Sequence, residues 1–268
     1  MNKEIKSISI IGYGSLSKVF LQAMKRRSDY KINGILVKDK ERKKEVESKG
    51  YHAYIEVEKM LADQPDYVVE FASGQAVKQY GVTILEKGIP FIIVSVGALA
   101  DEHLYKKLSD TAKQNQTKLF IASGAIGGFD LMRTLTLSGS PTVRIENFKS
   151  PQSFEGAPHL DGKTPSTQKE TVIFKGNAKD AIEGFPKNVN VAIAASLATV
   201  GTENSNVIIH SVPEQEENIH KITVENETAT AEIKITSHAS PDNPQSSTTT
   251  AWSVVALLDN LASPIQFF

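Results

Sequence analysis

The chain has 268 residues, and its 30 basic and 31 acidic residues give a formal net charge of −1. This balance argues against nucleic acid or an anionic membrane as the main partner, because those partners usually select a basic surface. The absence of cysteine excludes disulfides, thiolate nucleophiles and cysteine-ligated metals, and no metal site is predicted. No apolar stretch reaches the ~18 residues of a membrane-spanning helix, so a cytoplasmic protein is expected.

Short apolar runs alternate with longer amphipathic ones through the first half of the chain. Strands are predicted at residues 8–11, 32–37, 53–55, 67–71, 91–96 and 118–121, and helices at 16–26, 40–49, 57–64, 75–87 and 102–116. Alternating strands and helices of these lengths favour a parallel sheet that is covered on both faces. Right-handed crossovers then lead to an α/β fold with an N-terminal, doubly wound Rossmann domain.

The pattern changes after Gly128. Strands are predicted at residues 141–148, 171–174, 206–210, 220–225 and 230–237, and helices at 178–183, 189–199 and 246–261. Strands without intervening helices favour a mixed or antiparallel sheet in a second, α+β domain. We therefore expect a dinucleotide-binding domain over residues 1–123 and a substrate domain over residues 124–245. The last helix is predicted to pack back on the first domain.

A glycine-rich loop connects the first predicted strand to the first helix. Gly12 and Gly14 fit the first two positions of the Gly-x-Gly-x-x-Gly fingerprint of dinucleotide-binding folds, and Ser17 occupies the third. The pyrophosphate of a cofactor is expected on the helix N-terminus, where the backbone N–H groups of Ser15 and Leu16 have no helical partner. This context predicts that the chain binds NAD or NADP.

The end of the second strand ordinarily decides between these two cofactors. An acidic residue there binds the ribose hydroxyls of NAD, whereas a basic residue favours the 2′-phosphate of NADP. The deciding residue is Val37, Lys38 or Asp39, depending on the register of the strand. The sequence leaves the choice between NAD and NADP open.

Several later segments together resemble the L-aspartate dehydrogenase family, in that family's order and spacing over essentially the whole chain. The matching segments are Tyr67–Ser73, Ser95–Asp101, Ser123–Gly128 with Phe129 and Asp130 after it, Phe185–Ala192 and Pro241–Pro244. The element Ser-Val-Gly-Ala-Leu-Ala-Asp at residues 95–101 is similar to that of the family without a change. The sequence departs from the family pattern at Val212, Lys221 and Gln245, and at residues 148–152, which read Phe-Lys-Ser-Pro-Gln where the family commonly has Thr-Arg-Lys-Pro-Pro.

The resemblance implies roles for individual residues. Ala125 corresponds to an alanine that contacts the cofactor, and Asn190 to an asparagine that holds the nicotinamide carboxamide. Asn188 is interpreted as a simple helix N-cap. His220, in Asn218-Ile-His220, corresponds to the active-site histidine of the family. An imidazole with a pKa near 6.5 can accept and return protons, or bind a carboxylate when it is protonated, and both roles stay open.

The resemblance also implies an activity. It is the reversible, NAD(P)-dependent oxidative deamination of L-aspartate to iminoaspartate, and by hydrolysis to oxaloacetate and ammonia. In the family this imine can feed NAD biosynthesis, and the family forms homodimers. Two alternatives remain: a dehydrogenase of another small amino or oxo acid, and a dinucleotide-binding protein without catalytic activity.

Overall fold

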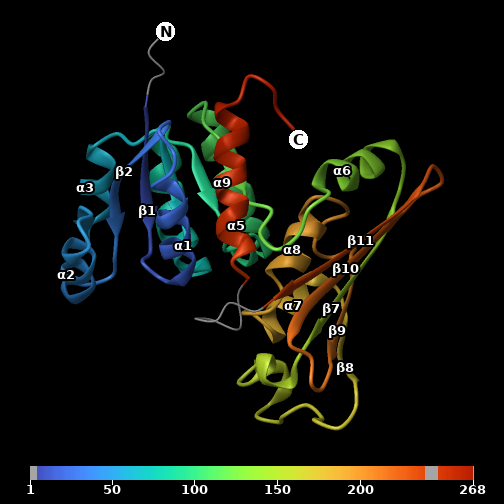
Figure 1. Ribbon diagram of the computed structural model, residues 1–268. Coiled ribbons are helices and arrows are strands. Elements are labelled where there is room, and N and C mark those ends of the chain that lie inside the picture. The colour runs from blue at the N-terminus through green and yellow to red at the C-terminus, as the bar shows by residue number, and fades with distance from the viewer. Residues whose placement is uncertain (1–4, 239–246, 268) are drawn as a thin grey trace. The chain divides into compact units, whose positions relative to one another are not determined.

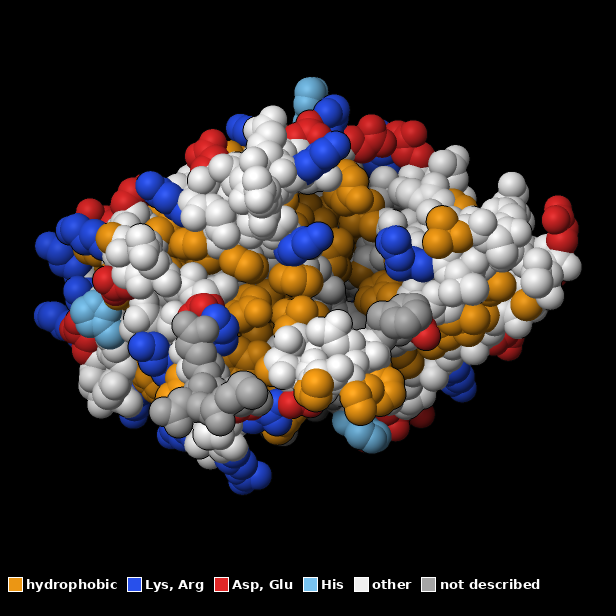
Figure 2. Space-filling view, turned by 90° about the horizontal axis from the view of Figure 1, so that it is seen from above, with side chains coloured by type: hydrophobic (Ala, Val, Ile, Leu, Met, Phe, Trp, Pro, Cys, Tyr) orange, Lys and Arg blue, Asp and Glu red, His pale blue; other side chains and the backbone are white. Residues whose placement is uncertain are grey.

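The computed structural model describes residues 5–238 and 247–267 of the chain. The chain divides into two compact units, which Figure 1 shows as ribbons. Unit 1 consists of Met1–Ala122 with Thr250–Phe267, and unit 2 of Ser123–Thr249. Within the described residues, no helix is both long and apolar enough to span a bilayer. Figure 2 shows acidic and basic side chains mixed along the margin of the face that it displays.

Unit 1 is built on a six-stranded sheet in the order β3-β2-β1-β4-β5-β6, and all of its strand pairs are parallel. Its strands are β1 (Lys6–Ile11), β2 (Tyr30–Leu36), β3 (Ala53–Tyr54), β4 (Tyr67–Glu70), β5 (Phe91–Ile93) and β6 (Leu119–Ile121). Its helices are α1 (Ser15–Met24), α2 (Lys40–Ser48), α3 (Val57–Ala62), α4 (Gly74–Glu86), α5 (Glu102–Gln114) and α9 (Thr249–Ala262). The predicted doubly wound fold is confirmed.

Successive residues of β5 show how both faces of this sheet are covered. Ile92 belongs to a buried cluster that includes Phe20 of α1 and Val254 of α9. Its neighbour Phe91 lies on the other face, next to Gly81 of α4 and Leu108 of α5. A Cβ atom on Gly81 would stand 2.8 Å from the Leu108 side chain, so this glycine lets α4 and α5 approach each other closely. The apolar runs of the sequence are therefore strands buried on both faces.

The last helix, α9, belongs to the core of unit 1 although it is far from that core in sequence. Its residues Ala251, Val254 and Leu258 are buried in the same cluster as α1. The hydroxyl of Tyr30 on β2 donates a hydrogen bond of 2.6 Å to the Leu258 carbonyl oxygen. The C-terminal segment thus completes one face of the first sheet.

Unit 2 contains a five-stranded sheet in the order β11-β10-β7-β9-β8. Its strands are β7 (Thr142–Lys149), β8 (Thr171–Gly176), β9 (Asn206–Ser211), β10 (Glu217–Glu225) and β11 (Thr230–His238), and its helices are α6 (Phe129–Ser138), α7 (Ala178–Gly184) and α8 (Asn190–Leu197). β7 and β9 are parallel and the other pairs are antiparallel. The predicted fold class of this second part, helices with a mixed sheet, is confirmed.

Two predicted strands differ from the structure by three residues at one end, the largest differences among the strands. The predicted strand 91–96 ends at Ile93, because the buried Glu70 carboxylate accepts hydrogen bonds from the N–H groups of Val94 and Ser95 and turns the chain out of the sheet. A 3₁₀ turn, Val96–Ala100, follows. β10 begins at Glu217, so His220 lies inside the strand and not at its start. The predicted turn at residues 241–244 and Gln245 lie outside the described residues.

Candidate active site

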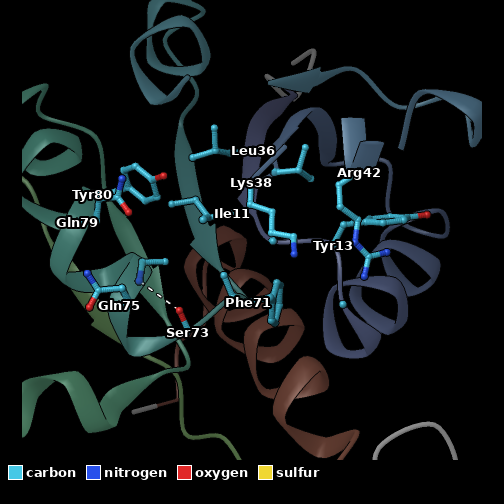
Figure 3. Close-up of a pocket in the computed structure, with 15 residues that line it drawn as sticks. Ile11, Tyr13, Leu36, Lys38, Arg42, Phe71, Ser73, Gln75, Gln79 and Tyr80 are labelled. Atoms are coloured by element: carbon cyan, nitrogen blue, oxygen red, sulfur yellow. Dashed lines mark hydrogen bonds between the residues drawn. The ribbon is translucent and has the colours of Figure 1, made fainter. Parts of the chain in front are cut away.

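A cavity of about 390 Å³ opens in unit 1 where β1, β2 and β4 end (Figure 3). Ile11, Leu36 and Phe71, which stand at or next to the carboxyl ends of these strands, line it. The strand order reverses between β1 and β4, and ligands of doubly wound sheets bind outside the strand ends at such a reversal. The cavity therefore lies where this fold binds its ligands.

The two glycines of the predicted loop both line this cavity, but the fold needs only one of them. Gly12 has a φ angle of +98°, and a Cβ atom there would stand 2.9 Å from the Cβ of Ala72. Gly14 has a φ of −102°, which any residue adopts, and a Cβ there would meet no atom within 4 Å. Packing thus explains Gly12, whereas Gly14 keeps open the space in front of α1.

The first turn of α1 faces this space, and no side chain in the described part of the chain accepts a hydrogen bond from its free N–H groups. Gly14 is the N-cap, no side chain caps the helix, and no acidic residue stands in its first turn. Ser15 and Leu16 begin the helix, so their N–H groups and the helix dipole are available to an anion. Ser17 is fully buried and donates a hydrogen bond of 3.0 Å to the Gly14 carbonyl oxygen. These residues fit the pyrophosphate of a dinucleotide.

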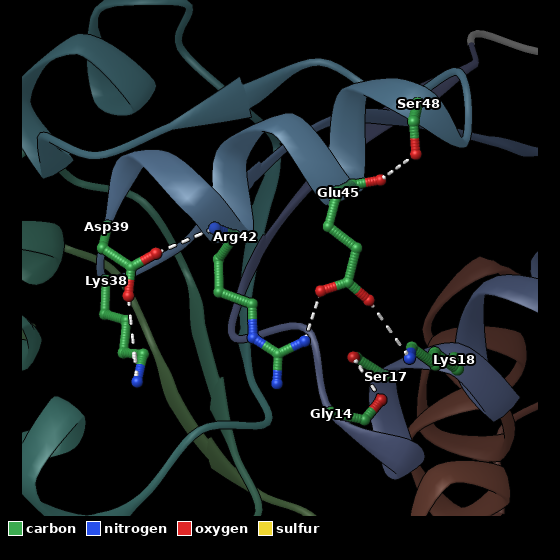
Figure 4. Close-up of polar contacts among 8 residues, drawn as sticks. All are labelled: Gly14, Ser17, Lys18, Lys38, Asp39, Arg42, Glu45 and Ser48. Atoms are coloured by element: carbon green, nitrogen blue, oxygen red, sulfur yellow. Dashed lines mark hydrogen bonds and ion pairs between the residues drawn. The ribbon is translucent and has the colours of Figure 1, made fainter.

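The rim of the cavity after β2 is basic. Lys38 and Arg42 line the cavity, and they are the only acidic or basic residues among the described residues that line it. The carboxylate of Asp39 is used to cap α2, because it accepts a hydrogen bond of 2.8 Å from the Arg42 N–H group (Figure 4). Val37 lines the cavity, but its side chain is apolar. Of the three residues that the sequence left open, only Lys38 brings a charge to the cavity.

The inward face of the sheet in unit 2 becomes polar at one end. His220 on β10 stands opposite Asn147 on β7, and Lys149, two residues further along β7, stands opposite Ser211 on β9. All four side chains are buried, with His220 exposed to 4% and Lys149 to 5%. Because residues in register or two apart share one face of a sheet, the four side chains form a polar cluster. We call it the inner polar cluster.

A hydrogen bond fixes the tautomer of His220. Its Nδ1 lies 2.6 Å from the Oδ1 atom of Asn147, which can only accept, so Nδ1 carries the proton and Nε2 keeps its lone pair. Burial and the nearby ammonium group of Lys149 lower the pKa of His220 to about 3. Burial lowers the pKa of Lys149 to about 8. At neutral pH the imidazole is neutral, which favours the proton-accepting role over binding a carboxylate as a cation.

The low pKa of His220 has a consequence for stability that can be measured. The folded chain does not bind the proton that the unfolded chain takes up near pH 6.5, so acid favours unfolding. This contribution to stability is complete above pH 6.5 and is lost progressively as the pH falls toward 3. We expect no titration of His220 in ¹⁵N NMR spectra of the folded protein between pH 8 and 5, and a midpoint near 6.5 in denaturant. A folded-state midpoint above pH 5 would contradict this assignment.

The other predicted site residues of unit 2 lie in loops and at a helix start. Ala125 is in the turn between β6 and α6, and Asn190 is the first residue of α8. The interpretation of Asn188 as an N-cap is wrong: Val189 occupies that position. The buried Asn188 amide donates to the Ser153 carbonyl oxygen at 3.0 Å, which ties α8 to a neighbouring loop.

The predicted site residues divide between the two units. Gly12, Gly14, Ser15 and Leu16 come together at the cavity of unit 1 or directly behind it, whereas Ala125, Asn190 and His220 belong to unit 2. Lys221, where the sequence departs from the family pattern, points to the face opposite His220 and pairs with Glu232 at 3.2 Å.

The sequence did not single out Asn147, and Lys149 was noted only within the segment 148–152 that departs from the family pattern. The available signal was the alternation along β7, where the inward positions change from Val143 and Ile145 to these two polar residues. A buried strand ordinarily continues its apolar pattern, so two polar inward positions in succession indicate a site.

Known proteins are similar to both halves of the chain. Residues 130–261 match the model of the C-terminal domain of aspartate dehydrogenase, and residues 12–122 match that of the NAD-binding domain of homoserine dehydrogenase. The L-aspartate dehydrogenase of Methanosarcina barkeri is 37% identical over 209 residues, which are 77% of each chain. That of Thermotoga maritima is 37% identical over 200 residues, which are 75% of this chain and 78% of the relative.

A solved structure is similar over nearly the entire length. The crystal structure of aspartate dehydrogenase from Thermotoga maritima superimposes with a TM-score of 0.77 at 29% identity, and the match covers 98% of this chain and 99% of that one. Both units, with the cavity of the first and the inner polar cluster of the second, fall within the matched part. The chain belongs to the L-aspartate dehydrogenase family.

Proposed function

We propose that this chain oxidises L-aspartate with NAD(P)⁺ to iminoaspartate, which water converts to oxaloacetate and ammonia. The observation that carries the proposal is the buried, neutral imidazole of His220, whose tautomer is fixed by Asn147 and whose neighbour is the buried cation Lys149. Family membership and the dinucleotide cavity of unit 1 support it. The same reaction in reverse would aminate oxaloacetate.

The residues of the chain supply binding and proton transfer. The open space at Gly14 and the N–H groups of Ser15 and Leu16 receive the pyrophosphate, and Ala125 and Asn190 are assigned to the nicotinamide end. The nicotinamide, when bound, supplies the acceptor for the hydride of the α-carbon. Nε2 of His220 accepts a proton from the substrate ammonium, because the α-carbon can lose a hydride only when the amine nitrogen has a free lone pair to form the imine. Once it has released that proton to solvent, the same nitrogen can take a proton from the water that attacks the imine.

The basic rim of the cavity leads to a prediction about the cofactor. We expect NADPH to bind at least about tenfold more tightly than NADH. Lys38 and Arg42 line the cavity and can exchange their exposed ion pairs, with Asp39 and with Glu45, for the 2′-phosphate. Lys38→Ala and Arg42→Ala should each weaken NADPH binding about tenfold and leave NADH binding within about twofold. Titration of the reduced nucleotides by fluorescence measures both.

The matched control for this prediction is Lys44→Ala, which removes an exposed lysine of the same helix that does not line the cavity. It should change neither affinity. Tighter binding of NADH than of NADPH by the unchanged protein would show that the rim does not select the 2′-phosphate.

The proposed activity is tested by NAD(P)H consumption with ammonia and a panel of oxo acids: oxaloacetate, pyruvate, 2-oxoglutarate and glyoxylate. The proposal expects oxaloacetate to be the best substrate by kcat/KM. Turnover of another acid without turnover of oxaloacetate would assign the chain to a different small amino or oxo acid. Tight NAD(P)H binding without any turnover would instead indicate a dinucleotide-binding protein without catalytic activity.

The proposal includes a homodimer and a cytoplasmic location. Family resemblance supports the dimer, and the use of a dinucleotide that is a cytoplasmic metabolite supports the location. Sedimentation of the purified protein at micromolar concentration should give a mass near twice the 29.2 kDa of the chain. A single species of 29.2 kDa would remove the dimer from the proposal.

A further inference from the structure

Lys149 is a buried cation that has no counter-charge in the described part of unit 2. Its side chain is exposed to only 5%, and burial is the one influence that acts on its pKa. The single buried carboxylate among the described residues of this unit, Glu146, points to the opposite face, where Arg144 pairs with it at 2.6 Å. An ammonium group in such surroundings is costly unless an anion joins it.

Two hydrogen-bond donors near Lys149 have no acceptor within the described part of the chain. The Nδ2 atom of Asn147 and the hydroxyl of Ser211 are both buried, and neither has a hydrogen-bond partner among the described residues. Ser211 stands opposite Lys149 on β9, and Asn147 is its neighbour on the same face of β7. Buried donors are ordinarily satisfied, so two unsatisfied donors on one face, beside a buried ammonium group, are a strong departure from the usual pattern.

We propose that Lys149, with the Ser211 hydroxyl and the Asn147 amide, binds a carboxylate group of the substrate. The inference rests on the proposed function, since it gives a binding site to one end of an amino dicarboxylic acid. A carboxylate accepts up to four hydrogen bonds and carries the charge that the ammonium lacks, so it satisfies all three donors at once. Asn147 then has two tasks, because its Oδ1 holds His220 while its Nδ2 meets the substrate.

A cation kept for a ligand should destabilise the protein that has no ligand. Replacing Lys149 by methionine, which has a similar length and no charge, removes the buried charge and leaves the packing nearly unchanged. We therefore expect Lys149→Met to unfold at a temperature higher by about 3 °C or more in the absence of ligand. If Lys149 only stabilised the fold, Lys149→Met would instead unfold at a lower temperature than the unchanged protein.

The binding test uses succinate, an unreactive dicarboxylate, added to the full chain saturated with NADP⁺ and followed by calorimetry. Lys149→Met should weaken succinate binding at least about thirtyfold, and Ser211→Ala about fivefold, while NADPH affinity stays within about twofold. Lys175→Met is the matched control, because it removes an exposed lysine from β8 of the same sheet. It should leave succinate binding unchanged.

Each result decides for or against the carboxylate site. Succinate binding within threefold of the unchanged protein in Lys149→Met, or no succinate binding by the unchanged protein, overturns it. If Lys149→Met does not fold, Ser211→Ala decides: about fivefold weaker binding supports the site, and unaltered binding overturns it. Absent aspartate turnover together with succinate binding that depends on Lys149 removes the proposed reaction and leaves the carboxylate site standing.

Discussion

Gly14→Val is expected to abolish NAD(P)H binding without unfolding unit 1. The backbone at Gly14 is extended, with a φ of −102°, and a Cβ atom there meets nothing within 4 Å, so the valine side chain fits the protein. It occupies instead the space in front of α1 where the pyrophosphate belongs. Loss of two hydrogen bonds from helix N–H groups to a charged phosphate raises the Kd at least about a hundredfold. Fluorescence titration with NADPH and NADH measures the change.

The matched control is Gly12→Ala, the other glycine of the same loop. Its φ of +98° and the contact of 2.9 Å with Ala72 make any side chain at residue 12 a strain on the fold. Gly12→Ala should therefore lower the unfolding temperature, whereas Gly14→Val should leave it within about 2 °C. NADPH binding by Gly14→Val that equals binding by the unchanged protein would mean that the pyrophosphate does not lie on α1.

His220→Ala is expected to lower kcat for aspartate oxidation at least about a hundredfold, the usual scale for a lost general base. The neutral imidazole offers Nε2 to the substrate, and alanine offers nothing in its place. Cofactor affinity should stay within about twofold, because no contact of the cavity in unit 1 changes. Initial rates with saturating NADP⁺ and aspartate measure the effect.

Added imidazole distinguishes a catalytic from a structural role for His220. If the side chain transfers protons, imidazole should restore part of the activity of His220→Ala, because it can enter the space that the deletion leaves. His210→Ala is the control: this histidine lies on the outer face of the sheet, stacked on Phe148 with ring centroids 4.2 Å apart. The His210→Ala variant should keep its activity within about twofold of that of the unchanged protein. Activity of His220→Ala within twofold of the unchanged protein would remove His220 from the mechanism.

Local patterns predicted the fold of unit 1 and its phosphate loop, because the features that form them are close together in sequence. The alternation of buried strands and helices leads to the doubly wound sheet, and Gly12 and Gly14 directly follow β1. The end of β5 escaped prediction because Glu70, which turns the chain at Ser95, is 25 residues away. Its effect depends on a tertiary hydrogen bond that the apolar run at residues 91–96 does not reveal.

The inner polar cluster escaped prediction for a similar reason. His220 and Asn147 are 73 residues apart, and their contact depends on the register between β7 and β10. A strand that carries polar residues on its buried face also lacks the alternation by which strands are recognised, so β10 was predicted to begin only at His220. The family resemblance identified His220, but the neighbours that set its tautomer and its charge became visible only in the folded sheet.

The most direct test of the central claim follows the α-hydrogen of aspartate. L-Aspartate that carries deuterium at the α-carbon is incubated with NADP⁺ and the protein, and the nucleotide and the carbon product are analysed by mass spectrometry. Oxidation by hydride transfer predicts NADPH that contains one deuterium, formed in equal amount with oxaloacetate and ammonia. Oxaloacetate or ammonia formed without deuterated NADPH, or no reaction with aspartate at all, would contradict the assignment of this chain as an aspartate-oxidising enzyme.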